Sequence, residues 1–145
     1  MAKKRNGRQD AIREIVRNTE VRTQRGLVDK LKACGYDCTQ ATVSRDIADM
    51  GLRKLPEGVY VLAEDLHLQR MVSELVVEVA RTDNLVLVKA QPGTASGIAA
   101  AIDAAERPDV LGSLAGNDTI LVIAQTAEDG ERFENMINKL RSARK

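Results

Sequence analysis

The sequence predicts an α+β protein of two domains, and three observations lead to this prediction. Residues 1–63 carry three helical patterns followed by a short β-hairpin pattern, whereas residues 74–145 carry a strand-strand-helix pattern twice. Residues 63–70 are polar and charged and are expected to form a linker or a loose helix, and the linker between the domains is placed over residues 64–73. Residues 1–62 hold 13 Lys and Arg against 8 Asp and Glu, and residues 63–145 hold 9 against 13. This charge asymmetry suggests that the first domain faces a polyanion and that the second domain has a different role.

The first domain is predicted to hold three helices with short connections. The first helix is expected over about residues 8–18, and Thr23 is placed to cap a second helix that ends at Gly35. A third helix begins after Thr39 and ends at Gly51. Two helices joined by a short glycine-containing turn, followed by a hairpin around residues 56–58, predict a winged helix-turn-helix. The residues expected to face inward are Ile12, Ile15, Val16, Leu27, Val28, Leu31, Val43, Ile47 and Met50.

The third helix has an outer face that suits a DNA groove. Ala41, Ser44, Arg45 and Ala48 share this face, which is small and polar with one long cation. Arginine makes bidentate hydrogen bonds to guanine, glutamine makes bidentate hydrogen bonds to adenine, and hydroxyls reach phosphates or base edges. An ordinary amphipathic surface helix is equally compatible with this stretch alone, and only its context favours DNA. The predicted DNA contacts are Gln40, Thr42, Ser44 and Arg45 on the helix and Arg53 and Lys54 on the wing.

The second domain is predicted to be a sandwich of helices on one face of an antiparallel sheet. Strands are expected over residues 74–80, 85–90, 110–116 and 119–125, and helices over 94–105 and 128–141. The first strand would turn Leu75, Val77 and Val79 to one side. Six alanines in the helix over 94–105 favour close packing against another subunit, although helix propensity explains them equally well. The last helix would bury Phe133, Met136, Ile137 and Leu140.

Several other classes of chemistry are disfavoured. The chain has no long apolar run and no secretory signal, which predicts a cytoplasmic protein that does not contact membranes. Cys34 and Cys38 are expected to be free thiols, because a chain with one histidine, His67, lacks the ligands for zinc. The segment over residues 93–97 lacks the nucleotide-binding loop pattern and fits a strand-helix junction capped by Thr94 better than an anion site. No carboxylate pair shows catalytic spacing, so no enzyme is predicted.

Three segments carry a resemblance to a known family. TQATVSRDI at residues 39–47, followed by a wing, resembles the DNA-binding domain of bacterial arginine repressors. PGTASGIAAAID at residues 92–103 and LGSLAGNDTILVIA at residues 111–124 resemble the ligand-binding and oligomerisation motifs of the same family. The resemblance covers nearly the whole chain. It implies a homotrimer that stacks into a homohexamer, with L-arginine as co-repressor at the trimer interfaces and no further cofactor or metal.

The resemblance also implies a function and a set of ligand contacts. The expected function is repression of arginine biosynthesis genes at a palindromic operator in double-stranded DNA, with activation of arginine catabolism left open. The alternatives are an architectural DNA-binding hexamer and a regulator of another amino acid such as citrulline. Two departures concern the ligand, since an acid of the family motif is Asn117 here and Ser96 stands where relatives often carry Gln or His. The implied ligand contacts are Ala95, Ser96, Asp103, Asn117, Asp118 and Thr119.

Overall fold

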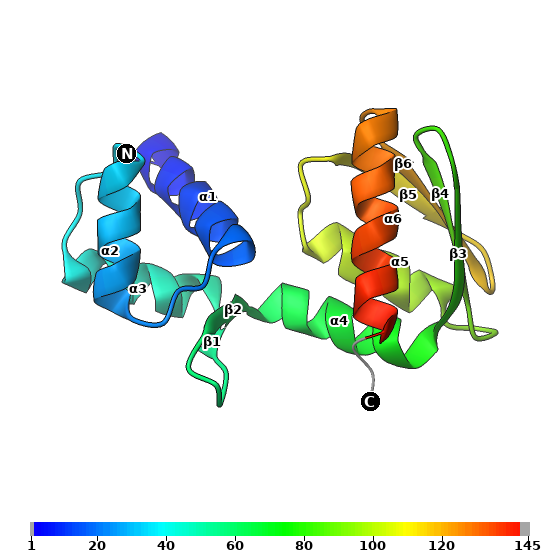
Figure 1. Cartoon of the computed structure of the whole chain (residues 1–145), viewed down its shortest axis with the longest axis horizontal. Helices are drawn as coiled ribbons and strands as arrows, with labels where there is room; N and C mark the ends of the chain where they lie inside the picture. The colour runs from blue at the N-terminus through cyan, green and yellow to red at the C-terminus, as the bar shows by residue number, and fades with distance from the viewer. Residues whose placement is uncertain (1, 143–145) are drawn as a thin grey trace. The chain divides into compact units, whose positions relative to one another are not determined.

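The computed structural model describes residues 2–142 of the 145-residue chain, with side chains described from Gly7 onward. The chain divides into two compact units, over residues 1–63 and 64–145 (Figure 1). Each unit has a hydrophobic core of its own. The predicted α+β class, with helices first and an antiparallel sheet with helices second, is confirmed.

The first unit consists of three helices and a two-stranded sheet. Thr39 accepts a hydrogen bond from the N–H of Thr42 at 3.2 Å, and Gly51, at φ 69°, ends the following helix in the left-handed region. The first helix begins at Ala2, before the expected Arg8. The elements are α1 (Ala2–Asn18), α2 (Gln24–Ala33), α3 (Gln40–Met50), β1 (Leu52–Lys54) and β2 (Tyr60–Leu62).

The core of the first unit joins all five of these elements. Every residue expected to face inward lies in this core or packs against it. Leu52 and Leu62 are directly opposite each other in the antiparallel pair β1–β2, and both are buried. The wing is therefore held to the three helices by apolar side chains. The buried residues are Ile12, Val16, Val21, Leu27, Val28, Leu31, Val43, Leu52 and Leu62.

The second unit is a four-stranded antiparallel sheet with helices on one face. The strand order is β3-β4-β6-β5, and the predicted strand-strand-helix repeat is confirmed after an additional helix. Val86 and Ile120 on the sheet pack with Ile102 and Phe133 on the helices. The elements are α4 (Ala63–Leu75), β3 (Val76–Thr82), β4 (Leu85–Ala90), α5 (Ala95–Ala104), β5 (Val110–Ala115), β6 (Thr119–Ala124) and α6 (Ala127–Ser142).

The segment 64–73 differs from the expected linker or loose helix. It lies within α4, and its Leu68 and Val72 are buried in the core of the second unit. Leu68, Val72 and Leu75 recur at the spacing of one helical face, which the charged residues between them obscure in the sequence. The segment is thus part of the second unit.

The start of β3 also differs from the predicted alternation. Leu75 ends α4 instead of lying in a strand, and Val77 is 50% exposed although it was expected on the same side as Val79. The pairing of β3 with β4 shifts between Val76 and Glu78, which is a β-bulge. An extra residue in one strand changes which side chains face the core, so Val76 packs there together with Val79, while Val77 does not.

The alanines of α5 serve mainly the packing of their own unit. Ala95, Ala99, Ala101 and Ala105 are buried in its core. Small side chains let α5 approach the sheet closely, and the structure accounts for these four alanines without a second subunit. The face of α5 that stays exposed is also made of small or polar residues, namely Ser96, Gly97, Ala100, Asp103 and Ala104.

The second face of the sheet has an apolar row across three strands. Leu121 on β6 is directly opposite Leu87 on β4 and Leu114 on β5, and Leu85 is opposite Ile123 in the next row. Leu114 is 67% exposed, and the other four are half-buried. Because residues directly opposite each other share a face, these five leucine and isoleucine side chains form one apolar surface, hereafter the outer sheet face.

Candidate DNA-binding surface and ligand site

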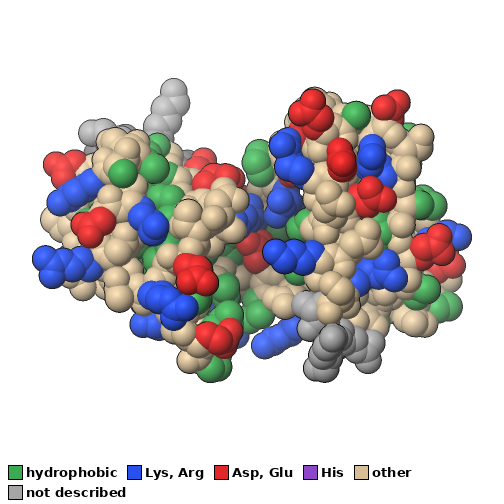
Figure 2. All heavy atoms as spheres, viewed as in Figure 1, with side chains coloured by type: hydrophobic (Ala, Val, Ile, Leu, Met, Phe, Trp, Pro, Cys, Tyr) green, Lys and Arg blue, Asp and Glu red, His purple; other side chains and the backbone are tan. Residues whose placement is uncertain are grey.

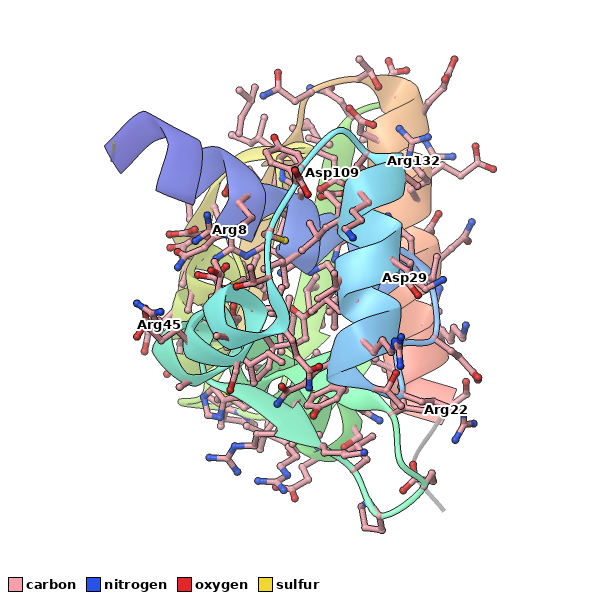
Figure 3. The ribbon with its side chains drawn as sticks, turned by 90° about the vertical axis from the view of Figure 1, so that its left-hand side faces the viewer. Arg8, Arg22, Asp29, Arg45, Asp109 and Arg132 are labelled. Carbon is pink, nitrogen blue, oxygen red and sulfur yellow. The ribbon has the colours of Figure 1, made fainter. Side chains whose placement is uncertain are left out.

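Helix α3 presents the outer face that the sequence predicted. Ala41, Ser44, Arg45 and Ala48 are exposed, while Val43 is fully buried. Figure 3 shows Arg45 projecting away from the helix bundle. Gln40, in the first turn, is exposed as well. The helix is therefore narrow on its outer side, with one long cation and two shorter polar side chains able to reach a partner.

Thr42 differs from the other predicted contacts on α3. It is half-buried, and its hydroxyl lies 3.1 Å from the hydroxyl of Thr39. The two hydroxyls share a hydrogen bond within the helix cap, which reduces the reach of Thr42 toward a ligand.

The wing exposes both predicted cations. Arg53 and Lys54 are exposed, and the Nζ of Lys54 lies 5.4 Å from the centre of the Tyr60 ring. This cation-π contact steadies Lys54 on the strand pair without removing its charge. Figure 2 shows Lys and Arg interspersed with Asp and Glu on the visible face of the first unit, so no single basic patch covers that face.

Two contacts with the backbone hold the wing in place. The N–H of Tyr60 donates to the carbonyl of Val21 at 2.8 Å, and Arg22 donates from its guanidinium to the carbonyl of Glu57 at 2.9 Å. Gly58, at φ 94°, closes the turn. Sequence reasoning missed Arg22, because nothing local indicates that it reaches a turn 35 residues away.

An ion pair between a half-buried arginine and a buried carboxylate joins α1 to α3, and sequence reasoning missed it too. Arg8 donates to both carboxylate oxygens of Asp46, from Nε at 2.5 Å and from Nη2 at 3.0 Å. Gln9 donates to the same carboxylate at 3.3 Å. These hydrogen bonds raise the pKa of the Arg8 guanidinium above its usual value against the opposing effect of desolvation. A hollow of about 180 Å³ beside the pair is lined by Arg8, Thr42, Arg45, Asp46 and Asp49.

Two turns of the second unit are joined at Asn117. Its backbone carbonyl accepts hydrogen bonds from the N–H groups of Gly93 at 3.1 Å and Ala95 at 3.4 Å. The β5–β6 turn therefore lies against the start of α5. The side chains of Asn117 and Asp118 are exposed there, and the hydroxyl of Thr119 donates to the Asp118 carboxylate at 2.9 Å. The arrangement offers one amide and one carboxylate to a small cationic or zwitterionic ligand.

The remaining predicted ligand contacts differ in their distance from Asn117. Ser96 is exposed in the first turn of α5, close to Asn117, whereas the Ala95 side chain is fully buried and presents nothing to a ligand. Asp103 lies eight residues beyond Ala95 along α5, which is about 12 Å at the helical rise. It accepts a hydrogen bond from Ser113 at 3.2 Å. Within one chain, Asp103 is thus separate from the other predicted contacts.

Thr94 does not act as a side-chain cap. Its hydroxyl donates to the carbonyl of Gln91 at 2.7 Å, and it accepts no hydrogen bond from the first turn of α5. Thr94 nevertheless occupies the predicted N-cap position, and its carbonyl accepts a hydrogen bond from the N–H of Ile98 at 3.2 Å. Its hydroxyl is used by the tight turn before the helix.

Other kinds of site find no support in residues 2–142. Within this range, no three His, Cys, Asp or Glu side chains come together in a way that would hold a metal ion. None of the described helices is both long and apolar enough to span a bilayer.

Comparison with known proteins decides the family. The model of the family described as "Arginine repressor, DNA binding domain" matches residues 3–68, and that described as "Arginine repressor, C-terminal domain" matches residues 72–139. The chain belongs to the arginine repressor family. It is 43% identical to the arginine repressor of Shouchella clausii over 140 residues, which cover 87% of this chain and 94% of that protein.

Other arginine repressors match to a similar extent. The protein of Thermus thermophilus is 45% identical, over 88% of this chain and 85% of its own length. That of Halalkalibacterium halodurans is also 45% identical, over 87% of this chain and 94% of its own length. The arginine repressor family consists of DNA-binding regulators, so the prediction that this chain is not an enzyme is confirmed. The predicted function as a DNA-binding repressor is confirmed at the level of the family.

Proposed function

We propose that this repressor reads a palindromic operator with α3 and represses arginine biosynthesis genes in the cytoplasm when L-arginine is bound. The observation that carries the proposal is the narrow outer face of α3, on which Ser44 and Arg45 are exposed between alanines. Small side chains allow the helix to enter the major groove, and the long cation reaches a base edge.

The proposal gives each exposed side chain a role. Arg45 makes bidentate hydrogen bonds to guanine, Gln40 makes bidentate hydrogen bonds to adenine, and Ser44 hydrogen-bonds to a phosphate or a base edge. Arg53 and Lys54 on the wing contact phosphates, which position the domain without reading sequence. Thr42 supports the helix cap through Thr39 and has the smallest share in recognition.

We assign the co-repressor to the turn around Asn117. The Asp118 carboxylate accepts charge-assisted hydrogen bonds from the guanidinium or ammonium group of arginine. Ser96 and Thr119 flank this position, and Asp103 contributes from another subunit because it lies too far away within one chain. The ligand favours the DNA-binding arrangement only to the extent that it binds that arrangement more tightly.

The outer sheet face supports the proposed assembly. Leu114 is 67% exposed, and with Leu87 and Leu121 it forms an apolar row that none of the described helices of the unit covers. Contiguous apolar surfaces of this kind mark sites of association. We propose that this face, rather than the alanines of α5, supplies the main apolar contact between subunits of a trimer, and that trimers pair into a hexamer.

One observation favours a second ligand. Asn117 carries an amide where an acid would pair with a cation, and an amide donates a hydrogen bond to the neutral ureido oxygen of citrulline. A response to citrulline is therefore the alternative to a response to arginine.

The test is operator binding measured by fluorescence anisotropy, with palindromic AT-rich duplexes, a non-specific duplex, and arginine or citrulline added separately. We expect arginine to tighten operator binding by about tenfold or more and to change non-specific binding little. Greater tightening with citrulline would support the alternative ligand. Equal operator affinity with no ligand, with arginine and with citrulline would overturn ligand control and leave an architectural DNA-binding role.

A further inference from the structure

We propose that Asp46 and Arg8 form a positioning pair that fixes the orientation of α3, and through it the specificity with which Arg45 meets its base. The proposal rests on the proposed reading of the major groove by α3. It gives a role to the buried carboxylate of Asp46 on α3, which is not exposed to contact DNA itself.

The burial of Asp46 is the first argument. Its side chain is 2% exposed, and it is the one charged or polar residue among those described that is buried. A carboxylate removed from water costs free energy that its partners only partly return, so a hydrophobic residue at this position would serve stability as well. A buried ion pair is better suited to fixing one arrangement among several.

The geometry of the pair is the second argument. The Nε and Nη2 atoms of Arg8 donate to the two oxygens of Asp46, so the planar guanidinium and the carboxylate lie edge to edge. The partners are 38 residues apart and belong to α1 and α3. Gln9, the next residue on α1, donates to the same carboxylate. Two consecutive residues of α1 therefore hold one side chain of α3.

The apolar contacts of α3 with the bundle lack this directionality. Val43 is fully buried and Ile47 packs beside it, but apolar contacts are non-directional and tolerate small rotations of a helix. The Arg8–Asp46 pair does not tolerate them, because a bidentate ion pair has one favourable plane. The pair thus sets the rotation of α3 about its axis.

The position of Asp46 makes that rotation matter for recognition. Arg45 is its neighbour in sequence, and both line the same hollow with Arg8 and Thr42. Figure 3 shows Arg8 and Arg45 on the same side of the first unit, one from α1 and the other from α3. A small rotation of α3 would displace the guanidinium of Arg45 from a base edge, while phosphate contacts of the wing would continue.

The experiment compares two arginine substitutions on α1 in the full-length protein. Arg8→Lys keeps the charge and loses the bidentate geometry. Arg13→Lys is the matched control, because Arg13 is also 20% exposed on α1 but forms its ion pair with Asp10 on the same helix. Asp46→Asn and Arg45→Ala complete the set. Affinity for operator and for non-specific DNA is measured by anisotropy, and folding by thermal melts followed by circular dichroism.

We expect Arg8→Lys to weaken operator binding about tenfold, the loss that follows when one bidentate base contact is misplaced, and to change non-specific binding by less than about twofold. Arg13→Lys should leave both affinities within about twofold of wild type. Asp46→Asn should match or exceed Arg8→Lys if it folds, and Arg8→Lys decides the question if it does not.

Two outcomes would overturn the positioning role. One is a wild-type ratio of operator to non-specific affinity in folded Arg8→Lys. The other is an equal loss of both affinities, which would make Arg8 a phosphate contact. Arg45→Ala separates this inference from the proposed function. If Arg45→Ala lowers the ratio of operator to non-specific affinity and Arg8→Lys does not, only the positioning role fails. If Arg45→Ala has no effect on this ratio, the proposed contact of α3 with the major groove itself fails.

Discussion

Gly130 is predicted to be a position where alanine destabilises a helix. It is buried in the first part of α6, against the β3–β4 turn. A Cβ atom added there would lie 2.8 Å from the carbonyl oxygen of Asp83 and 3.3 Å from the Cα of Asn84. Both atoms belong to the backbone. Asp83 has φ 54° and its carbonyl accepts a hydrogen bond from Arg81 at 2.8 Å, so the turn cannot move without losing other contacts.

Two opposing effects set the size of the change. Alanine stabilises a helix interior by about 1 kcal/mol relative to glycine. Forcing an extra carbon into a filled site costs about 1–3 kcal/mol, and a clash with backbone at 2.8 Å falls toward the upper end. We therefore expect Gly130→Ala to lower the free energy of unfolding of the second unit by about 1–2 kcal/mol. For a unit of this size, the melting temperature would fall by about 4–16 °C.

The chain offers a convenient assay for this prediction. It has no tryptophan, and its two tyrosines, Tyr36 and Tyr60, both lie in the first unit. Tyrosine fluorescence follows the unfolding of the first unit alone, whereas far-ultraviolet circular dichroism follows both. A shift in the dichroism transition with no shift in fluorescence places the change in the second unit.

Gly97→Ala is the matched control. Gly97 is also helical and in the second unit, but the nearest atom to its added Cβ is the terminal methyl of Met71 at 3.1 Å, which is flexible. This variant should be unchanged or more stable by up to about 1 kcal/mol. If Gly130→Ala proves as stable as Gly97→Ala, the argument from backbone proximity is refuted.

Four further predictions concern assembly, ligand, DNA and thiols. Leu114→Glu should shift the protein toward monomers in sedimentation velocity while leaving the dichroism spectrum unchanged, and an unaltered sedimentation coefficient would contradict the role of the outer sheet face. Asn117→Asp should tighten arginine binding about tenfold in calorimetry without tightening citrulline binding. The reason is that a charge-assisted hydrogen bond contributes about 1.5–3 kcal/mol, against about 0.5–1.5 kcal/mol for a neutral one. Equal arginine affinities in the two proteins would count against contact between residue 117 and the ligand side chain. Lys54→Ala should weaken operator and non-specific binding by the same factor and lower the salt slope by about one, whereas a loss confined to the operator would make it a base contact. Cys34 is exposed, whereas burial raises the pKa of the Cys38 thiol and so lowers the fraction of Cys38 that is thiolate at about pH 8. Mass spectrometry after treatment with an alkylating reagent should therefore find Cys34 modified first. The reverse order would exclude this explanation.

Features specified by neighbouring residues could be predicted from the sequence. The limits of α3 follow from Thr39 and Gly51, whose cap and left-handed turn act within one helical turn of each end. The exposed face of α3 follows from the helical repeat, which placed Arg45 outside and Val43 inside.

Features that depend on distant pairing could not be predicted in this way. Asp46 appears in the sequence as one more polar residue, and its burial follows from Arg8 on another helix. The bulge near Val77 depends on how β3 pairs with β4, which the alternation of one strand does not reveal. The contact between Asn117 and the start of α5 uses a backbone carbonyl, a group present in every residue and therefore absent from any sequence pattern.

That backbone contact has a consequence for how such repressors evolve. The β5–β6 turn is attached to α5 through the carbonyl of Asn117, while its side chain is exposed. An exchange of amide for acid at this position is nearly isosteric and leaves the attachment in place. The side-chain chemistry at position 117 is thus separable from the folding of the unit. If Asn117 contacts the co-repressor as proposed, single substitutions at this position would change the metabolite that is sensed without unfolding the second unit.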